Sequence, residues 1–364
     1  MTTAILVTGA GGPLGVNFTR SLREAQKDIR LIGTDANRWH LPLSLCDETY
    51  LIPFAKDTDG YAQALSEIID RESVAALMPT HPVEVRAIAA LRDAEKLVGV
   101  GTALPSTAVL ETADDKRATQ ERLEAAGIAV PRSLRIEEPG DIERAFDELT
   151  TGSEATVWVR GAGAPGLGIG GAALPCRDAQ TARAWVEHHN GYGKMAASEY
   201  LPGANLTWMG LFGQGQLLAA AARERLEYVL PHIAPSGVTG APAVSRTVES
   251  SELARLGEAA VRAIDLAPHG AYFVDFKGDM AGQPRVTEIN AGRSGTTVHF
   301  YTRAGCNFPW LLAALALGEA PRELVVPAPC VEADLYWVRT LDCGPELVRG
   351  DAGFDRFPRA PSRS

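Results

Sequence analysis

The sequence predicts an α/β domain followed by an α+β half, and two patterns support this. From residue 1 to about 112, short apolar runs alternate with segments of helical period, as expected of a parallel sheet with helices on both faces. Beyond about residue 155, strand patterns dominate instead. The change predicts two different architectures in one chain of 364 residues, a length that suggests two to three domains.

The first half begins with the strand "AILVT", a helix from about Pro13 to Ala25 and the strand "IRLIGTD". The next apolar runs predict strands at 50–53, 74–80 and 96–101, and helical patterns between them cover 59–72 and 82–95. A capped helix over about 115–126 ends at Gly127, and a strand follows Pro131.

The second half is richer in strands. Apolar runs predict strands at 155–160, 168–174, 195–201, 205–212 and 216–222, and helices at about 178–189 and 250–265. The runs "YFVDFKG" and "PRVTEIN" flank the turn "DMAGQ", which predicts a hairpin. The tail after Arg349 is rich in Pro, Arg and Ser, and we expect it to be loosely ordered.

Composition excludes several classes of protein. A net charge of −10 argues against a scaffold for nucleic acid. The five cysteines lie far apart without a CxxC pair, so neither a zinc knuckle nor a redox dithiol is predicted. The N-terminus lacks the basic region of a signal peptide, and no apolar run approaches the roughly 20 residues of a membrane span. We expect a cytoplasmic protein without nucleic-acid or membrane partners, and a homodimer because dimers are the commonest oligomers.

The first glycine-rich turn, "TGAGGPLG", has the spacing of a dinucleotide-binding fingerprint. An NAD(P) site would use Gly9, Gly12, Gly15 and, about twenty residues later, Asp35. Short-chain reductases also need a tyrosine with a lysine one helical turn on, and no Tyr-x-x-x-Lys occurs in the chain. We therefore interpret the turn as a scaffold that closes tightly against the sheet, and keep an NAD(P)-dependent reductase or epimerase as the alternative function.

A second glycine-rich stretch follows the strand that ends at Arg160. Six glycines occur in residues 161–171, without the Lys-Ser/Thr ending of a P-loop. Glycine lets backbone amides approach phosphate oxygens because no Cβ intervenes. The stretch could fold over a triphosphate as a lid, with Gly166 and Gly168 among its contacts.

Oxygen-bearing side chains gather on the predicted hairpin. Glu288 and Asn290 are two residues apart, so both point to one face of the sheet. Asp275 lies on the preceding strand. Two carboxylates and an amide suit Mg²⁺, which prefers oxygen ligands, with Mn²⁺ as the substitute. Upstream, "ASEYLPGANLTW" joins two strands through a Pro-Gly hinge where a carboxylate and backbone groups could bind an adenine edge.

Taken in order, these segments resemble the ATP-grasp superfamily, in particular the branch similar to the carbamoyl phosphate synthase large subunit. The resemblance covers residues 1 to about 320. It implies a Rossmann-like domain over 1–112 that does not bind NAD, followed by a two-lobed ATP-grasp domain. The N-terminal lobe with the lid would cover 113–195, the C-terminal lobe with the magnesium site 196–325, and a last strand and loose tail 326–364.

The resemblance also implies roles for individual residues. "TADDKRATQERLEAAGIAVPRS" is similar to the family's Asp-Lys helix, which makes Lys116 an ATP contact. "VWVRGAGAPGLGIGG" resembles the strand and lid, which makes Arg160 a phosphate contact. "SEYLPG" looks like the hinge, which implies Glu199 at the adenine amino group, with Tyr200 beside it and Leu201 contacting the base by its backbone. "VTEIN" resembles the metal signature, which implies the ligands Asp275, Glu288 and Asn290.

The sequence departs from this family in three places. Asn205 stands where an acid usually holds the ribose, "AGR" moves Arg293 one residue along, and Gly161 replaces a proline after Arg160. The first two changes are the only hints of a further alternative, a nucleotide-binding protein without catalysis.

The expected function is that of an ATP-dependent ligase. It would activate a small-molecule carboxylate as an acyl phosphate, with release of ADP, and pass the acyl group to an amine or ammonia. Arg223, Arg225 and Arg293 are candidates for holding the carboxylate or acyl phosphate. The loop "PSGVTG", with Ser236 and Gly237, is expected to close on the substrate.

Overall fold

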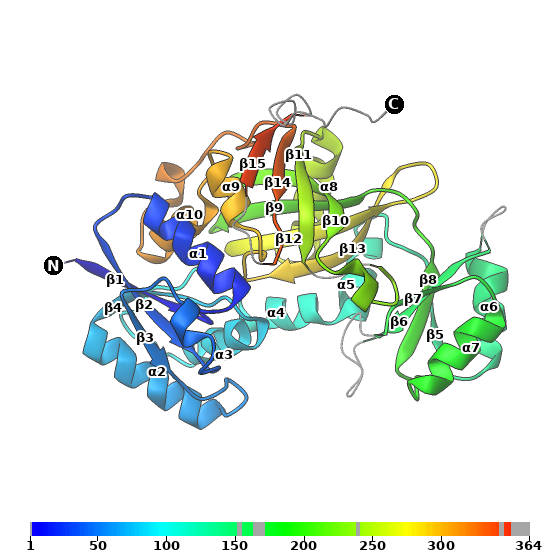
Figure 1. The fold of residues 1–364 in the computed structure, drawn as a ribbon, viewed down its shortest axis with the longest axis horizontal. Coiled ribbons are helices and arrows are strands. Elements are labelled where there is room, and N and C mark those ends of the chain that lie inside the picture. The colour runs from blue at the N-terminus through cyan, green and yellow to red at the C-terminus, as the bar shows by residue number, and fades with distance from the viewer. Residues whose placement is uncertain (1, 151–154, 163–171, 238–240, 342–345, 351–364) are drawn as a thin grey trace, which may run out of the picture.

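The computed structural model describes residues 2–150, 155–162, 172–237, 241–341 and 346–350. These residues form three sheets: a parallel one in the order β3-β2-β1-β4, an antiparallel one in the order β5-β8-β6-β7, and an antiparallel one of seven strands in the order β13-β12-β9-β10-β11-β14-β15. In Figure 1 the seven-stranded sheet lies between the other two. The predicted combination of an α/β and an α+β half is confirmed. The domain boundaries at 112, 195 and 325 stay predictions.

The parallel sheet is covered by helices on both faces. Its strands are β1 (Thr3–Thr8), β2 (Ile29–Asp35), β3 (Glu48–Leu51) and β4 (Val74–Met78), and its helices are α1 (Pro13–Glu24), α2 (Thr58–Glu72) and α3 (Pro82–Asp93). Ile5 and Val7 on β1 pack in the core that contains α1, whereas Leu6 between them packs in the core that contains α2 and α3. Alternation along a strand therefore supplies both faces.

The predicted strand at 96–101 is wrong. Only one bridge, between Ala76 and Gly101, joins this segment to the sheet. Glu95 and Gly99 have positive φ angles of 56° and 78°, so the backbone turns instead of extending. Val98 is 86% exposed, because the turn points it outward.

Two consecutive helices lead to the next sheet. The first, α4 (Thr107–Asp114), was not predicted, and the second, α5 (Lys116–Ala125), was. They are separated at Asp115, whose carboxylate accepts hydrogen bonds from the backbone N–H groups of Arg117 and Ala118. Asp115 thus caps α5 and fixes the position of Lys116 in its first turn.

The four-stranded antiparallel sheet carries α6 (Gly140–Leu149) and α7 (Ala179–His188) (Figure 1). Its strands are β5 (Ser133–Ile136), β6 (Val157–Gly161), β7 (Leu174–Cys176) and β8 (Met195–Glu199). Helix α6 was not predicted. Most of the predicted strand at 168–174 lies outside the described residues, as do the lid residues Gly166 and Gly168.

The seven-stranded sheet comprises β9 (Asn205–Gly213), β10 (Gln216–Tyr228), β11 (Pro242–Val248), β12 (Gly270–Gly278), β13 (Pro284–Ala291), β14 (Leu335–Val338) and β15 (Glu346–Arg349). The predicted β12–β13 hairpin is confirmed by its antiparallel register. Helix α8 (Ser251–Ile264) packs on one face, against Trp208 and Tyr272. The predicted loose tail lies almost entirely outside the described residues.

Helix α10 (Phe308–Ala316) connects the large sheet to the parallel sheet. Its residues share one core with Ile5 of β1, Phe18 of α1 and Met209 of β9. The short helix α9 (His299–Arg303) precedes it, and α1 contacts both helices (Figure 1). Among the described residues no helix is long and apolar enough to cross a membrane.

Close packing between α8 and β9 gives a test of this core. A Cβ added at Gly257 would lie 2.4 Å from Cδ2 of Trp208, which is only 1% exposed. We expect Gly257→Ala to lower the free energy of unfolding by about 1–3 kcal/mol, because the overpacked indole cannot move aside. Urea unfolding followed by tryptophan fluorescence measures the change.

The matched control is Gly140→Ala at the start of α6, where the nearest atom, Oε1 of Glu138, is 4.0 Å from the new Cβ. There the substitution should be neutral or stabilise by up to about 1 kcal/mol, since alanine favours helix. Equal stability of the two variants would contradict the packing argument.

Candidate active site

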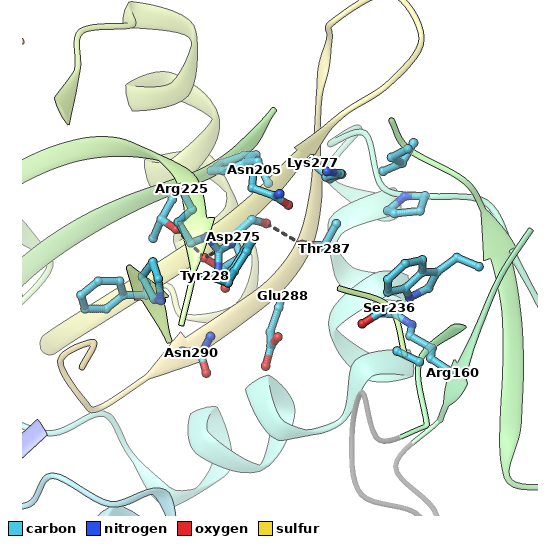
Figure 2. A pocket seen from close by; sticks show the side chains of 18 of the residues that line it. Arg160, Asn205, Arg225, Tyr228, Ser236, Asp275, Lys277, Thr287, Glu288 and Asn290 are labelled. Carbon is cyan, nitrogen blue, oxygen red and sulfur yellow. Dashed lines mark hydrogen bonds and ion pairs between the residues drawn. The ribbon is translucent and has the colours of Figure 1, made fainter. Parts of the chain in front are cut away.

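A cavity of about 660 Å³ lies between the two antiparallel sheets, with α5 contributing to its wall (Figure 2). This volume is typical of sites for small organic ligands. Thirteen of the residues predicted for the site line it: Lys116, Arg160, Glu199, Tyr200, Leu201, Asn205, Arg223, Arg225, Ser236, Asp275, Glu288, Asn290 and Arg293. Gly237 is described but is not part of the lining.

Strand register brings the polar residues into rows across the large sheet. Arg223 on β10 is opposite Thr207 on β9, Thr207 is opposite Asp275 on β12, and Asp275 is opposite Glu288 on β13. Directly opposed residues share a face of the sheet, so one row carries a cation, a hydroxyl and two carboxylates. A neighbouring row carries Arg225, Asn205 and Lys277.

The carboxylate of Asp275 is held in place by two side chains. Thr207 donates a hydrogen bond to Oδ1 over 2.8 Å, and Arg225 forms an ion pair with the same oxygen at 3.1 Å. Oδ2 has no such partner among the described residues. Asp275 is therefore oriented while one oxygen stays available.

Glu288 and Asn290 point the same way from β13 (Figure 2). The carboxylate of Glu288 forms no hydrogen bond or ion pair with any described residue. Oδ1 of Asn290 accepts a hydrogen bond from Arg293. Within the described part of the chain, no group of three His, Cys, Asp or Glu side chains could hold a metal, so a site here needs the amide oxygen of Asn290. Two carboxylates and an amide on adjacent strands fit Mg²⁺, which retains waters and shares its shell with phosphates.

Most cations of the cavity lack a carboxylate partner. Lys116, Arg160, Arg223, Lys277 and Arg293 form no ion pair with a described residue. Burial, and then the nearby Arg160, lower the pKa of Lys116 to about 8. Burial also lowers the pKa of Arg160 and of Arg293. Unpaired buried charge is costly, so this arrangement is suited to an anionic ligand.

The hinge after β8 presents free backbone groups to the cavity. The peptide N–H and C=O groups of Tyr200 and Leu201 form no hydrogen bond with described residues, although both residues line the cavity. The carboxylate of Glu199 instead accepts hydrogen bonds from the backbone N–H and the Nε of Arg132, at 3.2 and 3.1 Å. Arg132 therefore orients the Glu199 carboxylate in the cavity wall, and the role of Glu199 at an adenine amino group stays a prediction.

Several lining residues were not predicted. Thr207, Tyr228, Lys277 and Trp158 belong to the cavity wall. Trp158 lies two residues before Arg160 on β6, so strand alternation could have indicated it. Thr207 is opposite Asp275 only through the register of β9 and β12, which the sequence does not specify.

The first glycine turn lies outside this cavity. The N–H of Gly11 donates to Oδ2 of Asp35 at 3.1 Å, and the N–H of Gly12 donates to the carbonyl of Gly9. Pro13, at the start of α1, has no N–H. The N–H groups of Gly11 and Gly12 are thus bound within the chain, as expected of a scaffold.

No family model and no curated protein sequence matches this chain. Solved structures do. An L-amino acid ligase from Bacillus licheniformis superposes with a TM-score of 0.66 at 14% identity, over 92% of this chain and 78% of that one. An N5-carboxyaminoimidazole synthetase from Staphylococcus aureus, in complex with ADP, gives 0.66 at 16% identity, over 93% and 82%.

The biotin carboxylase domain of a Hydrogenobacter thermophilus 2-oxoglutarate carboxylase is similar to the same extent. This domain, in complex with MgADP, ADP and bicarbonate, superposes with a TM-score of 0.65 at 16% identity, over 93% of this chain and 74% of that one. All three superpositions extend over the parallel-sheet domain as well as the two antiparallel sheets, since each covers at least 92% of this chain. The chain therefore has the ATP-grasp fold, preceded by a parallel-sheet domain.

Proposed function

We propose that this protein is an ATP-dependent carboxylate–amine ligase, which activates a small-molecule acid as an acyl phosphate and couples it to an amine or ammonia. The observation that carries the proposal is the composition of the cavity. Unpaired cations, one buried and the others half-buried, lie beside two carboxylates and an amide on adjacent strands, as a metal-bound triphosphate requires.

The nucleotide base would lie at the hinge. Free backbone groups of Tyr200 and Leu201 offer a donor and an acceptor for an adenine edge, and Glu199, oriented by Arg132, would accept from the adenine amino group. Asn205 and Lys277 face each other across β9 and β12 and would contact the ribose. The similar synthetase and biotin carboxylase domain were solved in complex with ADP and MgADP, which supports a nucleotide in this position.

The phosphates would lie between Lys116, Arg160 and the hairpin. Asp275, Glu288 and Asn290 would hold Mg²⁺, which when bound neutralises the phosphates and aligns them for transfer. Thr207 keeps Asp275 oriented for this task. Gly166 and Gly168 remain proposed lid contacts.

The reaction requires two displacements. A carboxylate oxygen of the acid attacks the γ-phosphorus, and the bond to the β–γ bridging oxygen breaks, which releases ADP. The amine nitrogen then attacks the acyl carbon of the acyl phosphate, and inorganic phosphate leaves as the amine loses a proton. Arg293, beside Asn290, would balance the charge on the transferring phosphoryl group, and Ser236 at the cavity wall would contact the acceptor.

The remaining parts of the proposal follow from the sequence. They include the domain boundaries at 112, 195 and 325, a cytoplasmic location and a homodimer. The similar biotin carboxylase domain from Hydrogenobacter thermophilus is a dimer, which supports the last of these. Gly237 stays a proposed part of the loop that closes on the substrate, although it does not line the cavity.

A hydroxylamine trap tests the function. The protein is incubated with MgATP, hydroxylamine and pools of carboxylic acids, because hydroxylamine intercepts an acyl phosphate as a coloured hydroxamate. We expect ADP release to depend on the acid, and we expect the amount of hydroxamate formed to increase together with the amount of ADP. Binding of NADPH with no binding of MgATP in calorimetry would instead support a reductase.

Removal of one metal ligand should reduce turnover strongly without unfolding the protein. We expect Glu288→Gln to raise the activation free energy of phosphoryl transfer by about 2–4 kcal/mol, because a charge contact in the transition state is lost. The rate at which ADP is formed measures this change. Calorimetry should also show that Mg²⁺ no longer strengthens ATP binding. Because Glu288 has no partner among the described residues, the thermal midpoint should stay unchanged.

The matched control is Glu227→Gln, which removes an exposed carboxylate on β10 outside the cavity. This variant should bind MgATP and release ADP as the unaltered protein does. Full ADP release by Glu288→Gln would contradict the metal assignment.

The lowered pKa of Lys116 predicts a pH dependence of nucleotide binding. The free protein carries a charged Lys116 below its pKa of about 8, and a bound triphosphate would raise that pKa. Affinity for MgATP should therefore be full below pH 8 and fall by up to about tenfold per pH unit above it. Calorimetry between pH 7 and 9.5 measures the profile.

Lys116→Arg provides the control, because arginine stays charged throughout this range. Its affinity should be flat across the same pH window. A falling profile in this variant would assign the dependence to another group.

A further inference from the structure

The cavity as a whole carries more positive charge than the proposed nucleotide can neutralise. Six cationic side chains line the cavity against three carboxylates, and Arg132 already binds one of these, Glu199. A magnesium-bound triphosphate and one substrate carboxylate together carry less negative charge than this surplus of cations.

Part of this surplus of positive charge lies at Arg223 on β10. This side chain is 5% exposed, and burial lowers its pKa. With described side chains it makes one hydrogen bond, from Nη1 to the hydroxyl of Thr297, and its Nε has no partner. The ring of Tyr301, 6.0 Å from the guanidinium, supplies only a weak cation–π contact. A buried guanidinium with so few acceptors is suited to an anion.

Neighbouring residues add hydrogen-bond donors beside Arg223. Arg225 follows two residues later on the same strand face, and its carboxylate partner is Asp275. If Asp275 held a metal, Arg225 would share that partner and would be better able to bind another anion. The hydroxyl of Tyr228 is buried without a partner among the described residues. Arg339, which follows β14, has its pKa lowered to about 10 by burial and then by Arg223.

Arg225 reaches the proposed metal site through its ion pair with Asp275, whereas Arg223 lies farther along the row of opposed residues. Arg223 and Glu288 lie on strands three positions apart, which corresponds to about 14 Å between backbones. Arg225 and Tyr228 group on one side of the cavity, and Arg160 lies across it (Figure 2). An acid whose first carboxylate reaches the γ-phosphate beside Glu288 can therefore place a second group at Arg223.

We propose that the acid substrate carries a second anionic group, and that Arg223 and Arg225, with the hydroxyl of Tyr228, bind this group while the first carboxylate is phosphorylated. The inference rests on the proposed function and names its substrate class. A dicarboxylic acid and an acid with a phosphate or phosphonate group share the required chemistry. An acid with a neutral second group would leave Arg223 buried without a counter-charge.

Equilibrium binding tests the proposal without turnover. Isothermal titrations use the full chain, with and without Mg²⁺ and a non-hydrolysable ATP analogue. The ligands are straight-chain and α-amino dicarboxylic acids of three to eight carbons, their monoamides, and matched phosphono monoacids. We expect at least one dianionic acid to bind about 10- to 100-fold more tightly than its monoamide, because the amide replaces the second charge. The phosphono arm identifies which anion fits better.

Variants assign the preference to this cluster. Arg223→Met should reduce the ratio of the two affinities to about one, and Tyr228→Phe, which keeps the ring in place, should reduce it severalfold. Tyr228→Phe carries the test if Arg223→Met fails to fold. Arg246→Gln, which removes an arginine of β11 that pairs with Glu224 outside the cavity, should leave the ratio unchanged.

Equal affinity for dianionic acids and monoamides, or no binding of any dianionic acid to a protein that binds the nucleotide, overturns the proposal. Retention of the preference in Arg223→Met and Tyr228→Phe does so too. Failure of the nucleotide to bind instead overturns the proposed function. The titrations without nucleotide then still decide whether the cluster selects a dianion.

Discussion

The site depends on one constraint, the alternation of side chains on the central strands of the large sheet. Trp208, Tyr272 and Val274 face α8 and pack in a closed core. The residues that alternate with these along β9 and β12 point to the opposite face of the sheet. One part of that face is buried in a core, and the next part lines the cavity. Along β9 that face changes from Leu211 and Met209, which pack near α10, to the cavity residue Thr207. The same strands therefore anchor the sheet and present the polar row.

This alternation explains how much of the site could be predicted. The spacing of Glu288 and Asn290 places both on one face of any strand, and the hairpin brings Asp275 opposite Glu288. The sequence could not specify the pair between Arg132 and Glu199, which are 67 positions apart. The segment 96–101 has the apolar composition of a strand, but positive φ angles at Glu95 and Gly99 turn it away from the sheet. The sequence predicts which residues share one face of a strand. The register between strands and the local backbone geometry decide which of these residues lie next to one another.

Charge in the cavity follows from the same geometry. Lys116 lies in the first turn of α5, next to the cap Asp115, so its position is set by the helix. Its low pKa arises from burial and from Arg160, while Glu288 and Asp275 oppose the shift. The protein thus holds cations close together where the carboxylates are too few to pair with them. This arrangement lowers the free energy of unfolding of the ligand-free protein, and an anionic ligand would raise it again.

The glycine turn that resembles a dinucleotide site contributes to this cavity through α1. Gly15 lacks a Cβ where one would lie 2.1 Å from the carbonyl of Gly9, so α1 can begin directly against the turn. From that position Asn17 donates a hydrogen bond of 2.8 Å to the carbonyl of Thr296, which lines the cavity. Asn307 in turn donates to the carbonyl of Ser21 on α1. The motif therefore positions α1, and α1 holds the loop after Arg293, while the amides of Gly11 and Gly12 donate to Asp35 and Gly9.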